Sequence, residues 1–540
     1  MEFLYLYAFF IALFSSVVLI PFLIKYAKRL HLVDNPVGNL RKLHQKPMPR
    51  SGGLGIIVPT AIAILIILPW DDSVFSYLIG SLIIISFGLV DDVLELKPAQ
   101  KLIGQALGVT LAMVGGMIIA DVPFIENCPS WISYTITFGF VMAVINGVNF
   151  SDGMDGLAAG TALMALVLIF TLAVSVGNTQ VAIIAVAICA GLAGFLRFNT
   201  HPATVFMGDA GSQFLGFSVA WLAISLTQAD TSGLATLMPL LILGIPIMDV
   251  LQVIPVRIKK NLPLPGPDKE HFHHQIIKLG FPHAGVVAII YLLQLMLLVG
   301  AFGLQSQDNL VVLVFYLSYL LIVLGFLYFG HASGWRLKNK NGLERVGNRN
   351  NVFRRLSSLH PYSGKFYGLL IAALLCLFAL MSTDIPKVFI YITLLLGVIL
   401  LVLKLFSRGR WRLLIGRVAT YIAAPVCVYG MSLSSFGQNL TWEFNALFMV
   451  LAALLAISIR TTRKEYFWLT PSDLLVLFFV MFFAPQLSLE LGQGVHASAL
   501  VFKTIVLLYT CEYVLARGVE AQNRLTIAAI FSMFVLAIHL

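Results

Sequence analysis

Apolar stretches about twenty residues long alternate with short polar connections along the whole chain. A helix of that length crosses the hydrocarbon core of a bilayer, so each stretch predicts a membrane-spanning helix. We count about eighteen such helices and expect an all-α polytopic membrane protein. The expected spans are centred on Phe14, Ile62, Ile84, Leu111, Phe140, Leu168, Ile188, Val219, Leu243, Leu295, Tyr319, Leu374, Leu394, Tyr429, Leu451, Phe479, Leu507 and Phe531.

Lysine and arginine fall mainly on one side of this expected bundle. They follow the odd-numbered spans, for example in 25–50, 257–278 and 336–365, whereas Asp and Glu dominate the opposite connections, where Lys387 is the one basic residue. Because basic loops stay in the cytoplasm, this segregation predicts an amino terminus outside the cell. The first apolar run starts at Phe3 without a basic leader, so we expect it to be the first span rather than a cleaved signal peptide.

The composition supports the membrane interpretation. The 540 residues are 59% hydrophobic and 11% charged, whereas a soluble domain is about 25% charged. The net charge of +10 is explained by the basic loops on one side of the bilayer. It gives no reason to expect a nucleic-acid partner.

One polar stretch, 146–160, stands out between two long apolar runs. It reads N-G-V-N-F-S-D-G-M-D-G-L-A-A-G and contains Asn146, Asn149, Asp152 and Asp155. An Asx-rich turn between two spans is the plain interpretation, but helix capping needs fewer amides and carboxylates than this. Ionisable groups at the mouth of a membrane bundle favour a functional site.

Other polar residues fall at the same expected cytoplasmic edge. They occur at the end of the third span, after the seventh, around the ninth, and in the first and the long cytoplasmic loops. They are Asp91, Asp92, Lys101, Gln105, Asn199, His201, Asp209, Ser212, Asp249, Arg257, His271, His273, His274, Lys46 and Arg50.

Clustered carboxylates with lysine and arginine suit a divalent cation and phosphate groups. Mg²⁺ prefers carboxylate and phosphate oxygens, and phosphoryl transfer depends mainly on positioning and charge neutralisation. The pattern therefore favours Mg²⁺, with Mn²⁺ as an alternative. The histidines of H-F-H-H do not share one helical face, so phosphate contact, a zinc site and a solvated loop all stay open for them.

At this point the motifs resemble those of the polyprenyl-phosphate N-acetylhexosamine-1-phosphate transferases. The matching segments are K-P-M-P-R-S-G-G-L-G, D-D-V with Lys101 and Gln105, N-G-V-N-F-S-D-G-M-D-G-L-A, V-F-M-G-D-A-G-S, P-I-M-D with Arg257, and H-F-H-H. They run in family order from about residue 25 to about residue 280.

The resemblance implies transfer of a sugar-1-phosphate from a UDP-sugar to undecaprenyl phosphate, with release of UMP and a requirement for Mg²⁺. The implied catalytic residues are Asp91 and Asp92, the base and its companion, and Asp209. The implied metal ligands are Asp209, Asp92 and Asp155. The implied substrate-binding residues are Lys46, Arg50, Lys101, Asn146, Asn149, Asp152, Asp155, Asp249, Arg257, His271, His273 and His274. Whether transfer is direct or passes through an aspartyl intermediate stays open.

The resemblance also narrows the donor and the product. The H-x-H-H form is similar to that of enzymes using UDP-GlcNAc or related acetamido sugars, and it differs from that of the branch using UDP-MurNAc-pentapeptide. It implies initiation of a cell-surface polymer such as O-antigen, capsule or teichoic acid, at the cytoplasmic face of the bacterial inner membrane. The sugar itself stays open.

The carboxyl-terminal part exceeds what this family requires. We expect a transferase core of about eleven spans in 1–334, a basic cytoplasmic linker in 335–365, and about seven further spans in 366–540. The last region could form a homodimer, recruit a downstream glycan enzyme or guide the lipid, and the sequence does not distinguish among these three roles.

A transporter or flippase for a lipid-linked or anionic substrate is the alternative of a different class. About eighteen spans would allow it. Transporters, however, place ionisable substrate ligands near the bilayer midplane, whereas here they gather at one edge.

Overall fold

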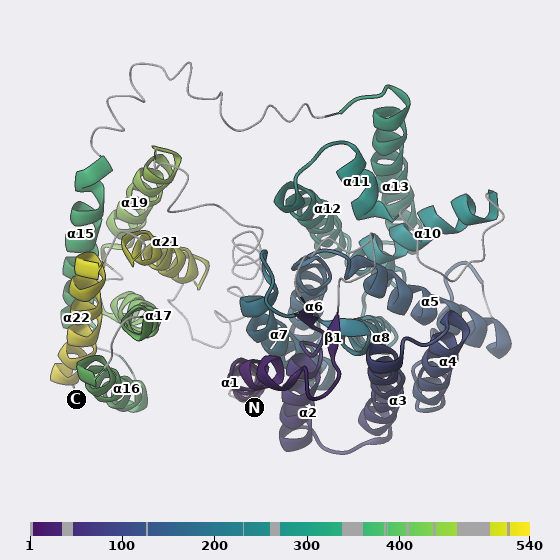
Figure 1. The fold of residues 1–540 in the computed structure, drawn as a ribbon, viewed down its shortest axis with the longest axis horizontal. Helices are drawn as coiled ribbons and strands as arrows, with labels where there is room; N and C mark the ends of the chain where they lie inside the picture. Colours follow the sequence, from purple (N-terminus) through teal and green to yellow (C-terminus); the bar gives the residue numbers. More distant parts are fainter. Residues whose placement is uncertain are drawn as a thin grey trace. The chain divides into compact units, whose positions relative to one another are not determined.

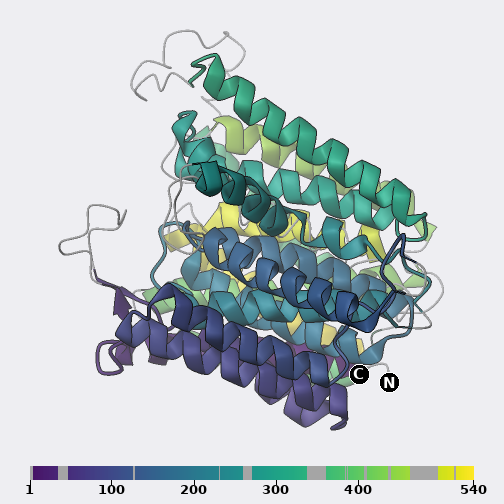
Figure 2. The ribbon, with the colours of Figure 1, turned by 90° about the vertical axis from the view of Figure 1, so that its right-hand side faces the viewer.

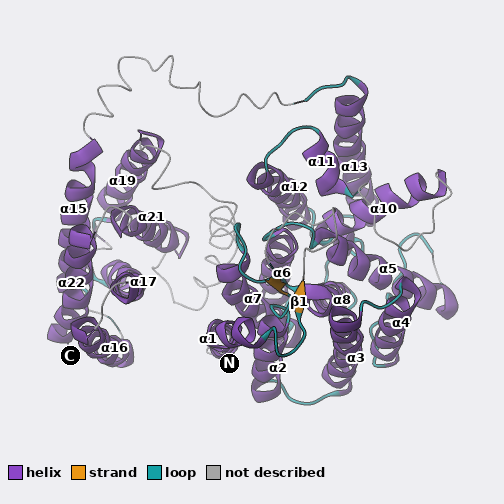
Figure 3. Ribbon diagram, in the orientation of Figure 1, coloured by secondary structure: helices purple, strands orange, loops and turns teal. Residues whose placement is uncertain are grey.

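The computed structural model describes residues 4–34, 47–125, 128–229, 232–259, 271–336, 360–382, 385, 387–406, 410–435, 439–461, 497–515 and 519–539. This part of the chain is helical apart from connecting loops and one small two-stranded sheet (Figure 3). The described residues divide into two compact units, one up to residue 336 and one from residue 360 onward.

The expected all-α membrane architecture is confirmed. Among the described residues, nine helices are long and apolar enough to cross a membrane, and shorter apolar helices accompany them. The total of about eighteen spans, the outside amino terminus and the proposed domain limits stay predictions. The span expected around Phe479 lies outside the described residues.

The first unit is a bundle of helices with the small sheet at one end (Figures 1 and 2). Its helices are α1 (Leu4–Tyr26), α2 (Leu54–Ile67), α3 (Asp72–Leu94), α4 (Pro98–Val114), α5 (Ser130–Ser151), α6 (Leu157–Ser175), α7 (Thr179–Asn199), α8 (Gly208–Thr227), α9 (Met238–Ile242), α10 (Gly244–Lys259), α11 (Phe272–Lys278), α12 (His283–Gly303) and α13 (Asn309–Ala332); its strands are β1 (Val33–Asp34) and β2 (Met48–Pro49).

Helices α6, α7 and α8 form the centre of this bundle and are buried along nearly their whole length. Their sequences are rich in alanine and glycine, which lets neighbouring helices approach closely. For example, Ser16 Oγ of α1 donates a hydrogen bond of 3.0 Å to the carbonyl oxygen of Gly191 in α7. A Cβ added at Gly194 would lie 2.5 Å from the same hydroxyl oxygen.

The span expected around Leu243 is broken into two helices, α9 and α10, which meet at that residue. At the break, Tyr316 donates a hydrogen bond of 3.1 Å to the carbonyl oxygen of Gly244, and Gln294 donates one of 2.9 Å to that of Ile242. Pro246 has no N–H to donate to Ile242, so Gln294 of α12 supplies the missing donor, and Tyr316 of α13 adds a further one at the start of α10.

The second unit contains its own buried core. Its described helices are α15 (His360–Met381), α16 (Lys387–Phe406), α17 (Arg410–Leu433), α19 (Thr441–Thr461), α21 (Ala497–Leu515), α22 (Val519–Val535) and the 3₁₀ helix η1 (Leu536–His539). Side chains such as Phe378, Cys427 and Met533 are buried together at its centre.

Candidate functional site

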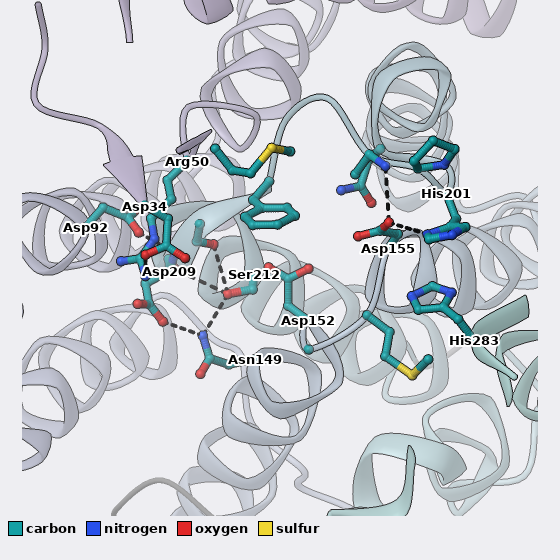
Figure 4. Close-up of a pocket in the computed structure, with 18 of the residues that line it drawn as sticks. Asp34, Arg50, Asp92, Asn149, Asp152, Asp155, His201, Asp209, Ser212 and His283 are labelled. Carbon is teal, nitrogen blue, oxygen red and sulfur yellow. Dashed lines mark hydrogen bonds and ion pairs between the residues drawn. The ribbon is translucent and has the colours of Figure 1, made fainter. Parts of the chain in front are cut away.

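A cavity of about 590 Å³, lined by many ionisable side chains, lies in the first unit (Figure 4). The sequence-predicted residues that line it are Arg50, Asp92, Asn149, Asp152, Asp155, Asp209 and His274. It is also lined by Asp34, Met48, Gly153, Met154, Asn199, His201, Pro202, Ala203, Phe206, Gly208, Ser212 and His283.

Asp92, near the end of α3, is anchored to the first turn of α8. Its Oδ1 accepts a hydrogen bond from the backbone N–H of Asp209 (2.8 Å), and its Oδ2 accepts one from that of Ala210 (3.1 Å). The carboxylate thereby satisfies free N–H groups at the positive end of the helix dipole. Gly208 makes this approach feasible, because its φ is +76° and an added Cβ would lie 2.7 Å from Asp92 Oδ2.

Asp209 is held by side chains from two other helices. Asn149 Nδ2, from α5, lies 2.7 Å from Asp209 Oδ1 and 2.7 Å from Ser212 Oγ. Lys101, from α4, forms ion pairs with Asp91 and, at 3.5 Å, with Asp209 Oδ2. Asp91 itself is buried and does not line the cavity.

Arg50 is positioned at the cavity by the small sheet. Strands β1 and β2 pair antiparallel, and Arg50 Nη2 donates a hydrogen bond of 2.8 Å to Asp34 Oδ1. The backbone N–H of Phe206 in turn donates one of 2.7 Å to the carbonyl oxygen of Pro49. The guanidinium group of Arg50 therefore faces the carboxylates from a segment that backbone hydrogen bonds hold in place. Lys46 lies outside the described residues.

Asp152 lies between the two ends of the cavity in Figure 4. Burial, followed by the nearby carboxylates of Asp209, Asp92 and Asp155, raises its pKa well above the ordinary value, and Arg50 opposes that rise. This crowding of negative charge favours the binding of a cation.

Asp155 lies on the other side of the cavity, beside His201 and His283 (Figure 4). Its Oδ2 lies 2.7 Å from His201 Nδ1 and accepts a hydrogen bond of 3.1 Å from the backbone N–H of Ala203. The structure therefore does not bring Asp155 together with Asp92 and Asp209 as ligands of one ion. The chain turns between Asp152 and Asp155 at Gly153 and Met154, which directs the two carboxylates to different parts of the cavity.

The H-F-H-H motif belongs mainly to a buried cluster next to the cavity. Asp249 Oδ2 lies 3.0 Å from His271 Nδ1, and Asp249 Oδ1 accepts a hydrogen bond of 2.7 Å from the backbone N–H of Phe272. This carboxylate anchors the start of α11, from which His274 reaches the cavity. Burial, with the neighbouring histidines, lowers the pKa of His273 to about 3, so its imidazole is neutral near pH 7.

Several predicted substrate-binding residues do not line the cavity. Asn146 Nδ2 donates a hydrogen bond of 2.9 Å to Gln105 Oε1, and Gln105 Nε2 donates one of 3.1 Å to Gln213 Oε1. These three amides therefore link α5, α4 and α8. The cavity lining also excludes Asp249, Arg257, His271, His273 and Lys101, all of which lie in the described structure.

Sequence reasoning missed the roles of Asp34 and His283, and it gave His201 no role although its segment was singled out. Asp34 lies outside the quoted motifs, and its contact with Arg50 depends on the β1–β2 pairing. The P-H-A stretch at the start of α12 was a weak signal for His283. A search for polar residues at every expected helix start would have found it.

A Mg²⁺ ion fits the residues on the Asp209 side of the cavity. Three carboxylates, Asp92, Asp152 and Asp209, face this side with Asn149, and hard oxygen ligands of this kind suit Mg²⁺. Burial raises the pKa of Asp152, and the neighbouring carboxylates raise it further, so a bound cation would stabilise the ionised form of this side chain.

Comparison with known proteins agrees with this geometry. The model for glycosyl transferase family 4 matches residues 74–227. A probable undecaprenyl-phosphate N-acetylglucosaminyl 1-phosphate transferase of Bacillus subtilis (strain 168) is 33% identical over 305 residues, which cover 55% of this chain and 84% of the relative. The undecaprenyl-phosphate alpha-N-acetylglucosaminyl 1-phosphate transferase of Yersinia pestis is 28% identical over 326 residues, which cover 58% and 87%. The protein of the same description from Shigella flexneri is 29% identical over 279 residues, which cover 50% and 75%. The chain therefore belongs to the polyprenyl-phosphate N-acetylhexosamine-1-phosphate transferase family.

Proposed function

We propose that this protein transfers GlcNAc-1-phosphate from UDP-GlcNAc to undecaprenyl phosphate and releases UMP. The proposal rests mainly on the hydrogen bond between Asp92 of α3 and the backbone of Asp209 of α8. Both residues line a cavity that Arg50 and Asn149 also line. The names of the relatives support the lipid acceptor and the acetamido sugar.

We propose that Mg²⁺ binds Asp209 and Asp152 and neutralises the diphosphate of the donor when bound. The residues of the chain perform the remaining tasks. Arg50, held by Asp34, would bind phosphate oxygens on the same side of the cavity, and Asn149 keeps the Asp209 carboxylate in a fixed orientation.

In the reaction, an oxygen of the lipid phosphate forms a bond with the phosphorus that carries the sugar. The bond from that phosphorus to the bridging oxygen breaks, and the bridging oxygen leaves with UMP. Because the second pKa of a phosphate monoester is about 6, the lipid phosphate needs orientation more than deprotonation. We assign Asp92, which faces the cavity, as the acceptor of any remaining proton, and Asp91 as its companion that positions Lys101.

We place the reaction at the cytoplasmic face of a bacterial inner membrane, as the first step of a cell-surface polymer. The basic loops of the sequence and the cytosolic origin of nucleotide sugars support this side. The residues of 335–540, whose dimerisation or recruitment role is likewise our proposal, are not needed for this chemistry.

The test is release of UMP by the purified full-length protein. It is incubated with undecaprenyl phosphate, Mg²⁺ and, in turn, UDP-GlcNAc, UDP-GalNAc and UDP-glucose, with and without EDTA. We expect chelator-sensitive release that depends on the lipid and is fastest with UDP-GlcNAc. Absence of release with every donor, from monodisperse protein, would contradict the proposal and favour transport.

A further inference from the structure

A second group of metal-ligating side chains lies on the cavity wall away from Asp92 and Asp209 (Figure 4). Asp155 comes from the turn between α5 and α6, His201 from the loop after α7, and His283 from the first turn of α12. One ligand atom from each of the three lies within 4.8 Å of the other two. Three segments distant in the sequence thus bring a carboxylate and two imidazoles together.

We propose that Asp155, His201 and His283 bind a divalent transition-metal ion, of the class of Zn²⁺, Mn²⁺ or Co²⁺, at a site separate from the one assigned to Mg²⁺. Imidazole nitrogen suits these metals, whereas Mg²⁺ prefers an all-oxygen environment. Three protein ligands leave at least one coordination position open, and all three residues line the cavity. The open position therefore faces the space in which a substrate would lie.

Rotation of the imidazole rings would complete this site, because the lone pairs of stacked rings lie in nearly parallel planes. Ligands about 2.1 Å from a tetrahedral ion lie roughly 3.4 Å from one another. Asp155 Oδ2 and His201 Nδ1 are already 2.7 Å apart, and the rings of His201 and His283 are stacked with centroids 4.3 Å apart. An ion between them would replace the direct hydrogen bond between the carboxylate and the imidazole.

Two further features of the surroundings support a metal. The Nδ1 atom of His283 is buried and has no hydrogen-bond partner in the described structure, and a neutral imidazole can coordinate a metal through either nitrogen. The backbone N–H of Ala203 donates a hydrogen bond to Asp155 Oδ2, which orients the carboxylate in the way that supporting groups orient metal ligands.

The experiment is a Co²⁺ titration of the full-length protein in detergent, after chelator treatment and with Mg²⁺ in excess. Visible ligand-field bands and calorimetry report the binding, and no sugar donor is needed. We expect one Co²⁺ per chain in the wild type and at least tenfold weaker binding in Asp155→Asn, His201→Ala and His283→Ala. His331→Ala, at an exposed histidine of α13, and Asp209→Asn should keep the wild-type binding.

The proposal is overturned if the wild type binds no Co²⁺, or if the three substitutions leave binding unchanged. In that case Asp155 only fixes the loop after α7 through its hydrogen bonds to His201 and Ala203, and His283 only stacks on His201. X-ray absorption spectroscopy of the Zn²⁺-loaded wild type is a second measurement, which identifies the ligand atoms and needs no variant. Two imidazoles with oxygen ligands are expected, and an all-oxygen shell would contradict the proposal. Because neither measurement involves sugar transfer, failure here is distinguishable from failure of the proposed activity.

Discussion

The Asp92 carboxylate accepts a hydrogen bond of 2.8 Å from the backbone N–H of Asp209, so the end of α3 is joined to the start of α8 at the cavity. The same backbone carries the Asp209 side chain, whose orientation is fixed by Asn149 and Lys101. The geometry of Asp209 therefore depends on contacts from three other helices. That dependence explains why three separate motifs of the sequence are needed to build one carboxylate site.

The first prediction concerns Asp209. Asp209→Asn removes the charge but keeps a side chain of the same size beside Asn149. We expect transfer to fall about a hundredfold or more, because Asp209 would hold the Mg²⁺ that neutralises phosphate charge, and an asparagine binds this ion more weakly. UMP release measures the effect, and unchanged elution in size-exclusion chromatography shows that the variant is folded.

Asp121→Asn is the matched control for that variant. Asp121 accepts a hydrogen bond of 2.9 Å from Thr236 and does not line the cavity. It should retain wild-type turnover. Full turnover in Asp209→Asn would refute the role assigned to Asp209.

Gly208→Ala tests the approach between α8 and Asp92. The left-handed φ of +76° costs an alanine about 1–2 kcal/mol, and the added Cβ would in addition displace the Asp92 carboxylate. We expect a lower thermal midpoint and a marked loss of transfer.

Gly334→Ala provides the comparison for this variant. Gly334 has a φ of +65° but nothing within 4 Å of its added Cβ, so it isolates the backbone effect. It should lower the midpoint modestly and leave transfer intact. If the two variants behave alike, the contact with Asp92 is not important.

The raised pKa of Asp152 predicts a pH dependence of stability in chelator. A carboxyl that holds its proton more tightly when folded destabilises the fold as pH rises from its ordinary value of 3.8 through the raised value. Without metal, Asp152→Asn should therefore melt higher than the wild type at neutral pH. The difference should vanish near pH 4, as thermal scans between about pH 4 and about pH 8 would report.

Added Mg²⁺ should make the wild type melt at a higher temperature than Asp152→Asn at neutral pH. The ion would stabilise the wild type through the ionised Asp152, whereas the asparagine variant would gain less. A wild type that is more stable than Asp152→Asn at neutral pH in EDTA would show that burial and the neighbouring carboxylates do not destabilise the ionised Asp152.

The fourth prediction concerns the second unit. Deletion of residues 366–540 should leave UMP release largely intact, because every residue of the cavity belongs to the first unit. The truncated protein is purified in detergent and assayed beside the full chain. Loss of activity in a monodisperse truncation would mean that the second unit contributes to catalysis.

The sequence allowed the helical membrane architecture and much of the cavity to be predicted. Arg50, Asp92, Asp152 and Asp209 occur in motifs at the ends of apolar runs, and spans of similar length bring such ends to one side of a bundle. The positions of the charged residues in the sequence therefore indicated where the site lies.

Other features depend on tertiary contacts that a local pattern does not encode. Asp249 anchors α11 rather than lining the cavity, and Asn146 joins buried amides, although both belong to motifs that suggested substrate binding. Asp34 reaches Arg50 through a strand pairing across 12 residues that the structure leaves undescribed, and no periodicity indicated it.

The most direct measurement of the central claim follows a labelled phosphorus. UDP-GlcNAc carrying ³²P in the phosphate attached to the sugar is incubated with undecaprenyl phosphate, Mg²⁺ and the purified protein. The account predicts that the label moves into the lipid product together with the sugar while unlabelled UMP is released. Label that remains on the nucleotide as UDP, with the sugar alone transferred, would contradict it.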